Sequence, residues 1–419
     1  MTRPRPTAKQ LDYQSWEFGV FVHFGIRTFY EGHRDFDGKP MPPTGFNPTE
    51  LDCDQWAATA ARAGARYMVM TAKHHDGFAL WPSKTTDFSV ANSPWRDGQG
   101  DVVAEFIAAC RRHDLGCGLY YSPYDHTSPA YADEKAYDDY FVTQVSELLE
   151  PYGPIDILWF DGCGSEGHTY DWERILGEIR RMQPDILLFN MGDPDFRWVG
   201  NEAGLADRCN RNTAEYVPFS VRSDEPEALS RRWLPAECDC RMRDSNWFFS
   251  DQDEDTVKSL EELIGLYHYA CGRGANLLIN IGPDRRGLLP DRDAERLVEL
   301  GQEIERCFGS PLATLEDCVR EGDTWRYETS APYALIDHVI VGEDVARGEH
   351  IERFAIRATP WRSGPPITLY DGCTVGYQRI CRFPLVRTNR IWLEVLEADG
   401  EVTLDRLTFH SVETHAWRI

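Results

Sequence analysis

Ionisable side chains follow several short apolar runs of this sequence, and Asp161 is the foremost of them. In IDILWFDG an apolar run is followed by Asp161, and Gly162 directly after it allows a sharp turn. A carboxylate at the end of a buried strand can act as a nucleophile, a general base or a metal ligand. It can equally cap the helix that follows, so its position alone leaves these roles open.

Three histidines stand at comparable positions. His74 and His75 follow the apolar run YMVMTA, and His23 ends the run FGVFVH. A bend at Gly77 would let the two adjacent imidazoles face one ligand. Neutral imidazoles are suited to hydrogen bonds with ligand hydroxyl groups. A metal site built from His74, His75 and Asp161, or histidines satisfied within the core, are the alternatives.

General acid–base chemistry by carboxylates needs a second acid, and two glutamates are candidates. Glu202 lies in the polar, aromatic stretch FRWVGNEAGLADR, and Glu237 lies at an expected strand end in RRWLPAECDC. The sequence has no GxSxG nucleophile motif and no Walker-type phosphate loop. Paired carboxylates are therefore the chemistry that the sequence favours.

The elements that must position these residues alternate between strand and helix. Apolar, β-branched or aromatic runs at 18–25, 67–74, 115–123, 155–162, 186–192 and 276–283 predict strands, with a further one near 233–239. Amphipathic stretches at 54–63, 101–113, 136–149, 170–182 and 257–270 predict helices between them. Such repeated units predict a parallel sheet, and no GxGxxG turn follows the first strand. We therefore expect a (β/α)₈ barrel over residues 1–310, with its active site where the strands end.

The C-terminal part of the sequence has a different pattern. From about residue 332, short strand-like runs follow one another at intervals of 10 to 15 residues, without helical periodicity. This pattern predicts an antiparallel β-sandwich over residues 332–419, joined to the barrel by a connection at 311–331.

Composition narrows the choice of partners. The 419 residues include 44 Lys+Arg and 69 Asp+Glu, a formal charge of −25 that repels nucleic acid and anionic lipid. We therefore expect neither nucleic acid nor membrane as a partner, and a neutral small molecule as ligand. No membrane-spanning run or secretory signal is visible, and the 12 cysteines are scattered. These features predict reduced thiols and a cytoplasmic location.

Five motifs, in order, resemble the α-L-fucosidases of glycoside hydrolase family 29: WEFGVFVHFG, FNPTELDCDQW, YMVMTAKHHDGFALWPSKTTDFSV, IDILWFDG and GRGANLLINIGPDRRG. The resemblance runs from about Trp16 to Arg286. It implies a (β/α)₈-like barrel, a fucosylated oligosaccharide as substrate and no metal or other cofactor. It also implies a retaining mechanism through a covalent fucosyl-enzyme intermediate. A metal-dependent barrel hydrolase and an inactive glycan-binding protein on the same scaffold are the competing readings.

The resemblance also implies roles for single residues. Asp161 matches the nucleophile of the family, and His23, His74 and His75 match its fucose-binding histidines. Further residues expected to contact the sugar are Tyr121, Trp159, Trp81 and Glu31, the last in place of a Glu-Trp pair that the family often has.

The acid/base residue is less well fixed in the family. WVGNEAG resembles the segment that carries it in the subgroup acting on α-1,3/1,4-fucosyl branches, which points to Glu202. Glu237 matches another glutamate-bearing segment and is the reserve candidate, or otherwise a substrate contact.

Overall fold

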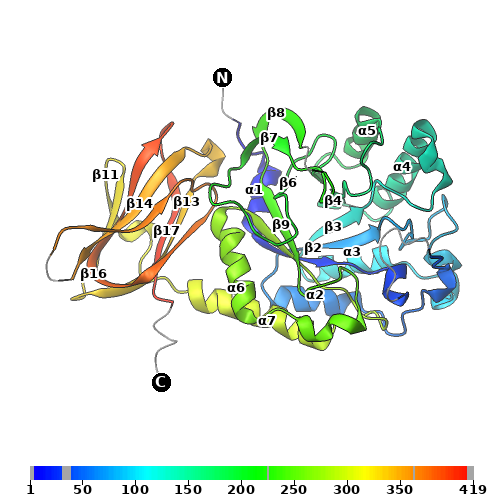
Figure 1. Cartoon of the computed structure of the whole chain (residues 1–419), viewed down its shortest axis with the longest axis horizontal. Helices are drawn as coiled ribbons and strands as arrows, with labels where there is room; N and C mark the ends of the chain where they lie inside the picture. Colours follow the sequence, from blue (N-terminus) through cyan, green and yellow to red (C-terminus); the bar gives the residue numbers. More distant parts are fainter. Residues whose placement is uncertain (1–3, 31–38, 224–225, 362–363, 413–419) are drawn as a thin grey trace.

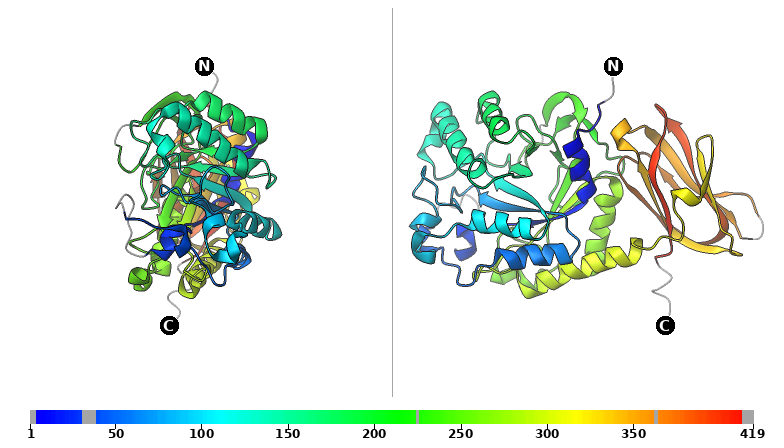
Figure 2. Two further views of the ribbon diagram at one scale, coloured as in Figure 1. Left: turned by 90° about the vertical axis from the view of Figure 1, so that its right-hand side faces the viewer. Right: turned by 180° about the vertical axis from the view of Figure 1, so that it is seen from behind.

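The computed structural model describes residues 4–30, 39–223, 226–361 and 364–412. A barrel with helices around it makes up the larger part of the molecule, and an antiparallel β-domain lies at one side of it (Figures 1 and 2). The order of the two parts along the chain is the one that the sequence predicts.

The barrel is built from eight strands within the described residues, and all their pairings are parallel. Their order is β5-β4-β3-β2-β1-β10-β9-β6, and a parallel bridge between Phe189 and Phe196 joins the two ends. The expected (β/α)₈-like barrel is therefore confirmed. The strands are β1 (Phe18–Val22), β2 (Tyr67–Lys73), β3 (Gly116–Tyr121), β4 (Ile157–Phe160), β5 (Leu187–Phe189), β6 (Arg197–Trp198), β9 (Ala236–Arg241) and β10 (Asn276–Asn280).

Helices surround the barrel (Figure 2). They are α1 (Ala8–Trp16), α2 (Cys53–Arg62), α3 (Val102–Arg112), α4 (Glu134–Leu149), α5 (Trp172–Met182), α6 (Leu260–Tyr269) and α7 (Asp291–Phe308). Four of these helices begin after an aspartate whose carboxylate accepts backbone N–H groups of the first turn: Asp52, Asp101, Asp133 and Asp171. Between β6 and β9 the chain forms a hairpin of β7 (Thr213–Val217) and β8 (Glu227–Trp233). No helix among the described residues is long and apolar enough to cross a membrane.

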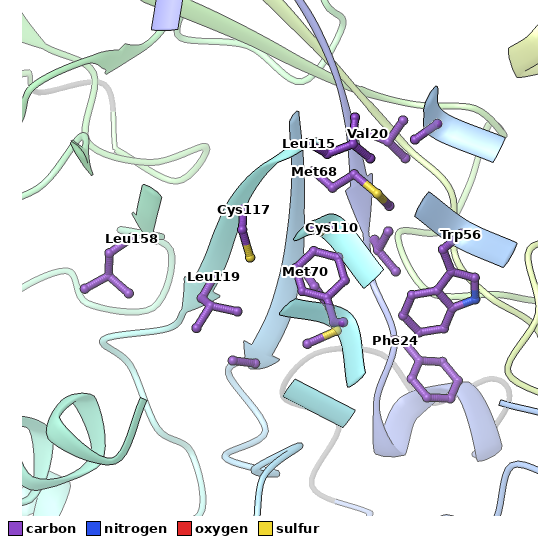
Figure 3. Close-up of a cluster of buried hydrophobic side chains, with 14 of the residues drawn as sticks. Val20, Phe24, Trp56, Met68, Met70, Cys110, Leu115, Cys117, Leu119 and Leu158 are labelled. Atoms are coloured by element: carbon purple, nitrogen blue, oxygen red, sulfur yellow. The ribbon is translucent and has the colours of Figure 1, made fainter. Parts of the chain in front are cut away.

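The barrel strands are buried on both faces. Outward side chains pack against the helices in the cluster of Figure 3, which includes Val20, Trp56, Met68, Met70, Leu119 and Leu158. Inward side chains form a separate, more aromatic cluster that includes Phe21, Tyr67, Tyr120, Trp159, Phe189 and Leu278. Because parallel strands are covered on both sides, their sequences carry no polar–apolar alternation that would distinguish the two faces.

The C-terminal domain is one antiparallel sheet that curls around its own core. Its long strand β16 pairs with β13 through its first half and with β12 and β14 through its second half, so it connects the two parts of the curled sheet. The strands are β11 (Cys318–Glu321), β12 (Thr324–Glu328), β13 (Ala334–Glu343), β14 (Ile351–Pro360), β15 (Ile367–Gly372), β16 (Arg379–Ala398) and β17 (Leu404–His410). The structure differs from the expected connection at 311–331, because β11 and β12 lie within that segment and are part of the sheet.

A disulfide between Cys209 and Cys373 links the barrel to the C-terminal domain. Nearby, the backbone N–H of Asn212 donates to Glu349 Oε2 at 2.9 Å. The expectation of reduced cysteines is wrong for this pair, whereas ten other cysteines of the described residues are free thiols. The scattered spacing of the cysteines could not reveal the pair, since its members are 164 positions apart.

Candidate active site

A cavity of about 250 Å³ opens at the carboxyl ends of the barrel strands. This is where the active sites of such barrels are found. The side chains that line it come from many strands and from the segment between β7 and β8. They include Phe21, His23, His74, His75, Tyr120, Trp159, Asp161, Asn190, Trp198, Glu202, Phe219, Val221, Arg222, Asp239 and Trp247.

Asp161 lies at the end of β4, where three groups hold its carboxylate. The Tyr120 hydroxyl donates to Oδ2 at 2.9 Å, the backbone N–H of Cys163 donates to Oδ1 at 2.8 Å, and His75 Nε2 lies 3.3 Å from Oδ2. Burial acts to raise the pKa of Asp161, but His75, the backbone N–H and Tyr120 outweigh it, so the pKa is lowered. Asp161 is therefore ionised at neutral pH, as a nucleophile must be.

His23 and His74, which line the same cavity, are buried and neutral. His23 Nδ1 lies 2.7 Å from Asn280 Oδ1, and the His74 ring stacks on Tyr120 with 5.4 Å between centroids. Burial lowers the pKa of His23 to about 3 and that of His74 well below its usual value. Neutral imidazoles can donate or accept a hydrogen bond, which suits the hydroxyl groups of an uncharged ligand.

Glu202 faces the same cavity from the segment after β6. Its Oε2 lies 3.7 Å from Arg241 Nη1. Burial raises the pKa of Glu202 and the charge of Asp161 adds to the effect, while Arg241 opposes it. Asp161 and Glu202, two of the carboxyl groups that line the cavity, thus have pKa values shifted in opposite directions, as an ionised nucleophile and a protonated acid require.

Two aromatic residues expected at the sugar lie elsewhere. Tyr121 faces the helices, where its hydroxyl donates to Gln144 Oε1 at 2.8 Å. Trp81 is buried in the same outer core, and its indole N–H donates to Glu147 Oε2 at 2.8 Å. The structure therefore brings neither side chain to the cavity. Glu31 lies outside the described residues.

Glu237, the reserve candidate for the acid, is fully buried and is not among the residues that line the cavity. Its carboxyl group accepts hydrogen bonds from Tyr13, Tyr67 and Trp159 in the layer beneath the cavity. Of the expected sugar contacts, the structure does bring Trp159 to the cavity, together with His23, His74 and His75.

Tyr120 and Asp239 line the cavity and were missed by sequence reasoning. Tyr120 pairs with Trp159 across β3 and β4, so the two share the inner face of the barrel, a relation visible only once the register is known. Asp239 accepts the indole N–H of Trp198 at 2.6 Å, and burial raises its pKa well above the usual value. Its position two residues after Glu237 on a strand was the available signal, because such residues share a face.

No group of three or more His, Cys, Asp or Glu side chains within the described ranges is arranged to hold a metal ion. Of the three residues considered as metal ligands, His75 and Asp161 contact each other directly, and His74 packs against Tyr120.

A parallel barrel whose mouth holds Asp161 and Glu202 with pKa values shifted apart has the groups that a glycoside hydrolase needs. The family model "Alpha-L-fucosidase" matches residues 34–306. Alpha-L-fucosidase 1 of Arabidopsis thaliana is 35% identical, over 92% of this chain and 83% of its own length. The chain therefore belongs to the α-L-fucosidase family, glycoside hydrolase family 29, and the resemblance of its motifs is confirmed.

Solved structures agree with this assignment. A glycoside hydrolase 29 family member from an unknown rumen bacterium superposes with a TM-score of 0.89 at 31% identity, over 98% of this chain and 78% of that chain. A Ruminococcus gnavus family 29 fucosidase, solved in complex with fucose, superposes with a TM-score of 0.82 over 98% of this chain and 96% of that chain. At 23% identity, the second similarity shows the shared fold.

Proposed function

We propose that this fucosidase is a retaining exo-glycosidase that removes terminal α-L-fucosyl residues, with Asp161 as nucleophile and Glu202 as acid/base. The observation that carries the proposal is the pair of carboxyl groups facing one small cavity with pKa values shifted apart. A volume of about 250 Å³ suits a ligand of the size of one sugar ring.

The chemistry divides into two displacements. Asp161 attacks the anomeric carbon while Glu202 gives its proton to the glycosidic oxygen, so the leaving alcohol departs neutral and a β-fucosyl ester remains. Glu202, now a carboxylate, takes a proton from water, and the water oxygen attacks the same carbon. Asp161 is released as a carboxylate and fucose leaves with its α-configuration retained.

The remaining residues of the cavity fit a neutral 6-deoxy sugar. His23, His74 and His75 supply hydrogen-bonding groups for ring hydroxyls, and aromatic faces such as that of Trp159 suit the C–H groups and the methyl group. Fucose bound in the Ruminococcus gnavus enzyme supports the same class of ligand. The net charge of −25 does not oppose an uncharged glycan.

We further propose that the substrate carries fucose in α-1,3 or α-1,4 linkage on a branched glycan. WVGNEAG carries Glu202, which lines the same cavity as Phe219 and Val221 of the segment between β7 and β8, and this supports a leaving group bound among them. Binding energy from the glycan would then lower the barrier of the chemical step.

The test compares an aryl α-L-fucoside with a Lewis-type trisaccharide, and follows the first-formed anomer by proton NMR. We expect α-fucose as the initial product, and a higher kcat/KM on the branched substrate. Initial release of β-fucose would overturn the retaining mechanism. Equal kcat/KM on both substrates would overturn the linkage preference. Tight fucose binding without turnover would identify an inactive glycan-binding protein instead.

A further inference from the structure

Four rings form a continuous stack across the inner wall of the barrel. Phe189 stacks on Trp159 with 3.9 Å between centroids, Trp159 on Tyr120 with 5.3 Å, and Tyr120 on His74 with 5.4 Å. The rings come from β5, β4, β3 and the residue after β2, which are neighbours in the sheet. We call these four residues the ring stack. All four line the cavity, so their placement shapes the site.

Glu237 holds this stack from the opposite side of the barrel. It lies on β9 and is 0% exposed, and its Oε1 accepts the indole N–H of Trp159 at 2.8 Å. Its Oε2 accepts the hydroxyl groups of Tyr13 and Tyr67 at 2.8 Å and 2.7 Å. One buried carboxyl group thus connects helix α1 and strands β2, β4 and β9 across the barrel interior.

From Trp159, which Glu237 holds, two further contacts lead to the nucleophile. Trp159 stacks on Tyr120, and the Tyr120 hydroxyl donates to Asp161 Oδ2 at 2.9 Å. Trp159 also precedes Asp161 by two residues, on the strand that Asp161 directly follows, and both residues line the cavity. A shift or tilt of the indole therefore reaches the nucleophile both through the backbone of β4 and through the tyrosine.

We propose that Glu237 is a positioning residue, which fixes the Trp159 indole and through it the hydrogen bond from Tyr120 to Asp161. The proposal rests on the assignment of Asp161 as the nucleophile. It gives Glu237 a role without substrate contact, in agreement with its complete burial and with its absence from the residues that line the cavity. A displacement of about 1 Å at reacting groups costs on the order of 100-fold in rate, so such a role has measurable consequences.

A positioning role and an acid/base role predict different kinetics. An acid/base residue matters most for poor leaving groups, and its loss is relieved by azide. A residue that orients the nucleophile matters for every leaving group, and azide does not restore its function. The loss of the Tyr120 hydrogen bond also raises the pKa of Asp161, so the acid limb of the pH profile moves to higher pH. The groups that act on Asp161 directly are His75, the Cys163 N–H and Tyr120, while His23 and Glu202 feel the charge of Asp161.

The experiment compares Glu237→Met, Glu237→Gln and the matched control Tyr67→Phe, each checked for wild-type circular dichroism. Tyr67→Phe removes one donor from Oε2 and leaves the indole bond in place. We expect Glu237→Met to lose about 10- to 100-fold in kcat on aryl and natural fucosides alike, with an acid limb at higher pH. Glu237→Gln keeps an acceptor for Trp159, so it should stay within about threefold of wild type, as should Tyr67→Phe.

Three results would overturn the proposal. The first is a Glu237→Met variant whose loss depends on the leaving group and is relieved by azide. The second is a folded Glu237→Met variant with the kcat and pH profile of the wild type. The third is a Tyr67→Phe variant that loses as much kcat as Glu237→Met. If Glu237→Met does not fold, Trp159→Phe removes the same hydrogen bond while keeping a ring. An unshifted acid limb in Trp159→Phe then overturns the proposal, and a shifted limb supports it. Inactivity of the wild-type enzyme, or a fully active Asp161→Gly, would instead refute the function on which the inference rests.

Discussion

The two faces of the barrel wall at β2 and β3 carry similar side chains with different consequences. The inner face presents His74 and Tyr120 to the cavity. On the outer face the adjacent residues Lys73 and Tyr121 form a closed cluster, in which Lys73 Nζ lies 3.1 Å from Asp125 Oδ2 and 4.2 Å from the centroid of the Tyr121 ring.

Both faces combine aromatic rings with ionisable groups. They differ in whether a ligand can reach those groups. Lys73 and Asp125 are 0% and 1% exposed, so each charge is compensated by the other and no space is left for a ligand. Asp161 has 25% of its side chain exposed, within a cavity that the neutral imidazoles of His23 and His74 also line. Residue type alone therefore does not mark a functional site in this barrel; a cavity beside groups with perturbed pKa values does.

The largest expected effect comes from removing the inner carboxylate. Asp161→Gly should lower kcat by about 10⁴-fold, because no nucleophile remains to form the ester intermediate. Added azide should restore part of the turnover and yield β-fucosyl azide, since a small anion enters the vacated space and inverts the anomeric centre once. The product is identified by NMR. An α-configured azide, or nearly normal activity, would contradict the assignment.

The second effect concerns the acid on the other side of the cavity. Glu202→Ala should slow natural fucosides by about 10²- to 10⁴-fold, because their alkoxide leaving groups need a proton. Aryl fucosides with acidic phenols should form the intermediate nearly normally and then stall, because water activation needs the same residue. A burst of phenol release, followed by faster turnover with azide, is the measurement. If Glu237→Ala shows this pattern and Glu202→Ala does not, the assignment moves to Glu237.

The fold was predictable from the sequence because the patterns that indicate it extend over whole segments and do not depend on single residues. Apolar runs separated by amphipathic stretches are enough to predict a parallel barrel, and the polar residues that follow these runs are enough to locate its mouth. Asp161 and the three histidines follow from that rule. Motif resemblance added Trp159 and favoured Glu202 over Glu237, and the residues named here line the cavity in the structure, apart from Glu237.

The choice between neighbouring residues was not predictable. Tyr120 and Tyr121 are both fully buried, so nothing in their local sequence says which of them faces the barrel interior. A register shift between Thr71 and Lys73 further changes how β2 meets β3. Glu237 and Asp239 share one face of β9, but Asp239 lines the cavity and Glu237 does not. The difference depends on Tyr13 and Tyr67, whose hydroxyl groups bond to Glu237 in the barrel interior.

The third prediction compares the two tyrosines directly. Tyr120→Phe removes a hydrogen bond to the charged nucleophile and should lower kcat/KM by about 10- to 100-fold. Tyr121→Phe removes a bond to Gln144 on the far face, so it should cost about 1 kcal/mol of stability and change kcat/KM by less than about threefold. Steady-state kinetics and thermal unfolding of both variants test this, and a greater kinetic loss in Tyr121→Phe would contradict the comparison of the two faces.

The smallest expected effect is a shift of the pH profile. In the proposed mechanism the alkaline limb of kcat/KM reports the loss of the Glu202 proton. The Arg241 guanidinium favours the ionised carboxylate and so opposes the rise in the pKa of Glu202 that burial causes. In Arg241→Gln this opposition disappears, and the alkaline limb should move to higher pH by up to about one unit, with little change in the acid limb.

Salt provides an independent check, because the Arg241 and Glu202 side chains are 27% and 32% exposed and the two charged atoms lie 3.7 Å apart. Screening at about 1 M salt weakens their attraction, so the alkaline limb of the wild-type enzyme should move in the same direction as in Arg241→Gln. The variant itself should respond less to salt, since its partner charge is already absent. An alkaline limb that moves to lower pH in Arg241→Gln would show that the proton lost there does not belong to Glu202.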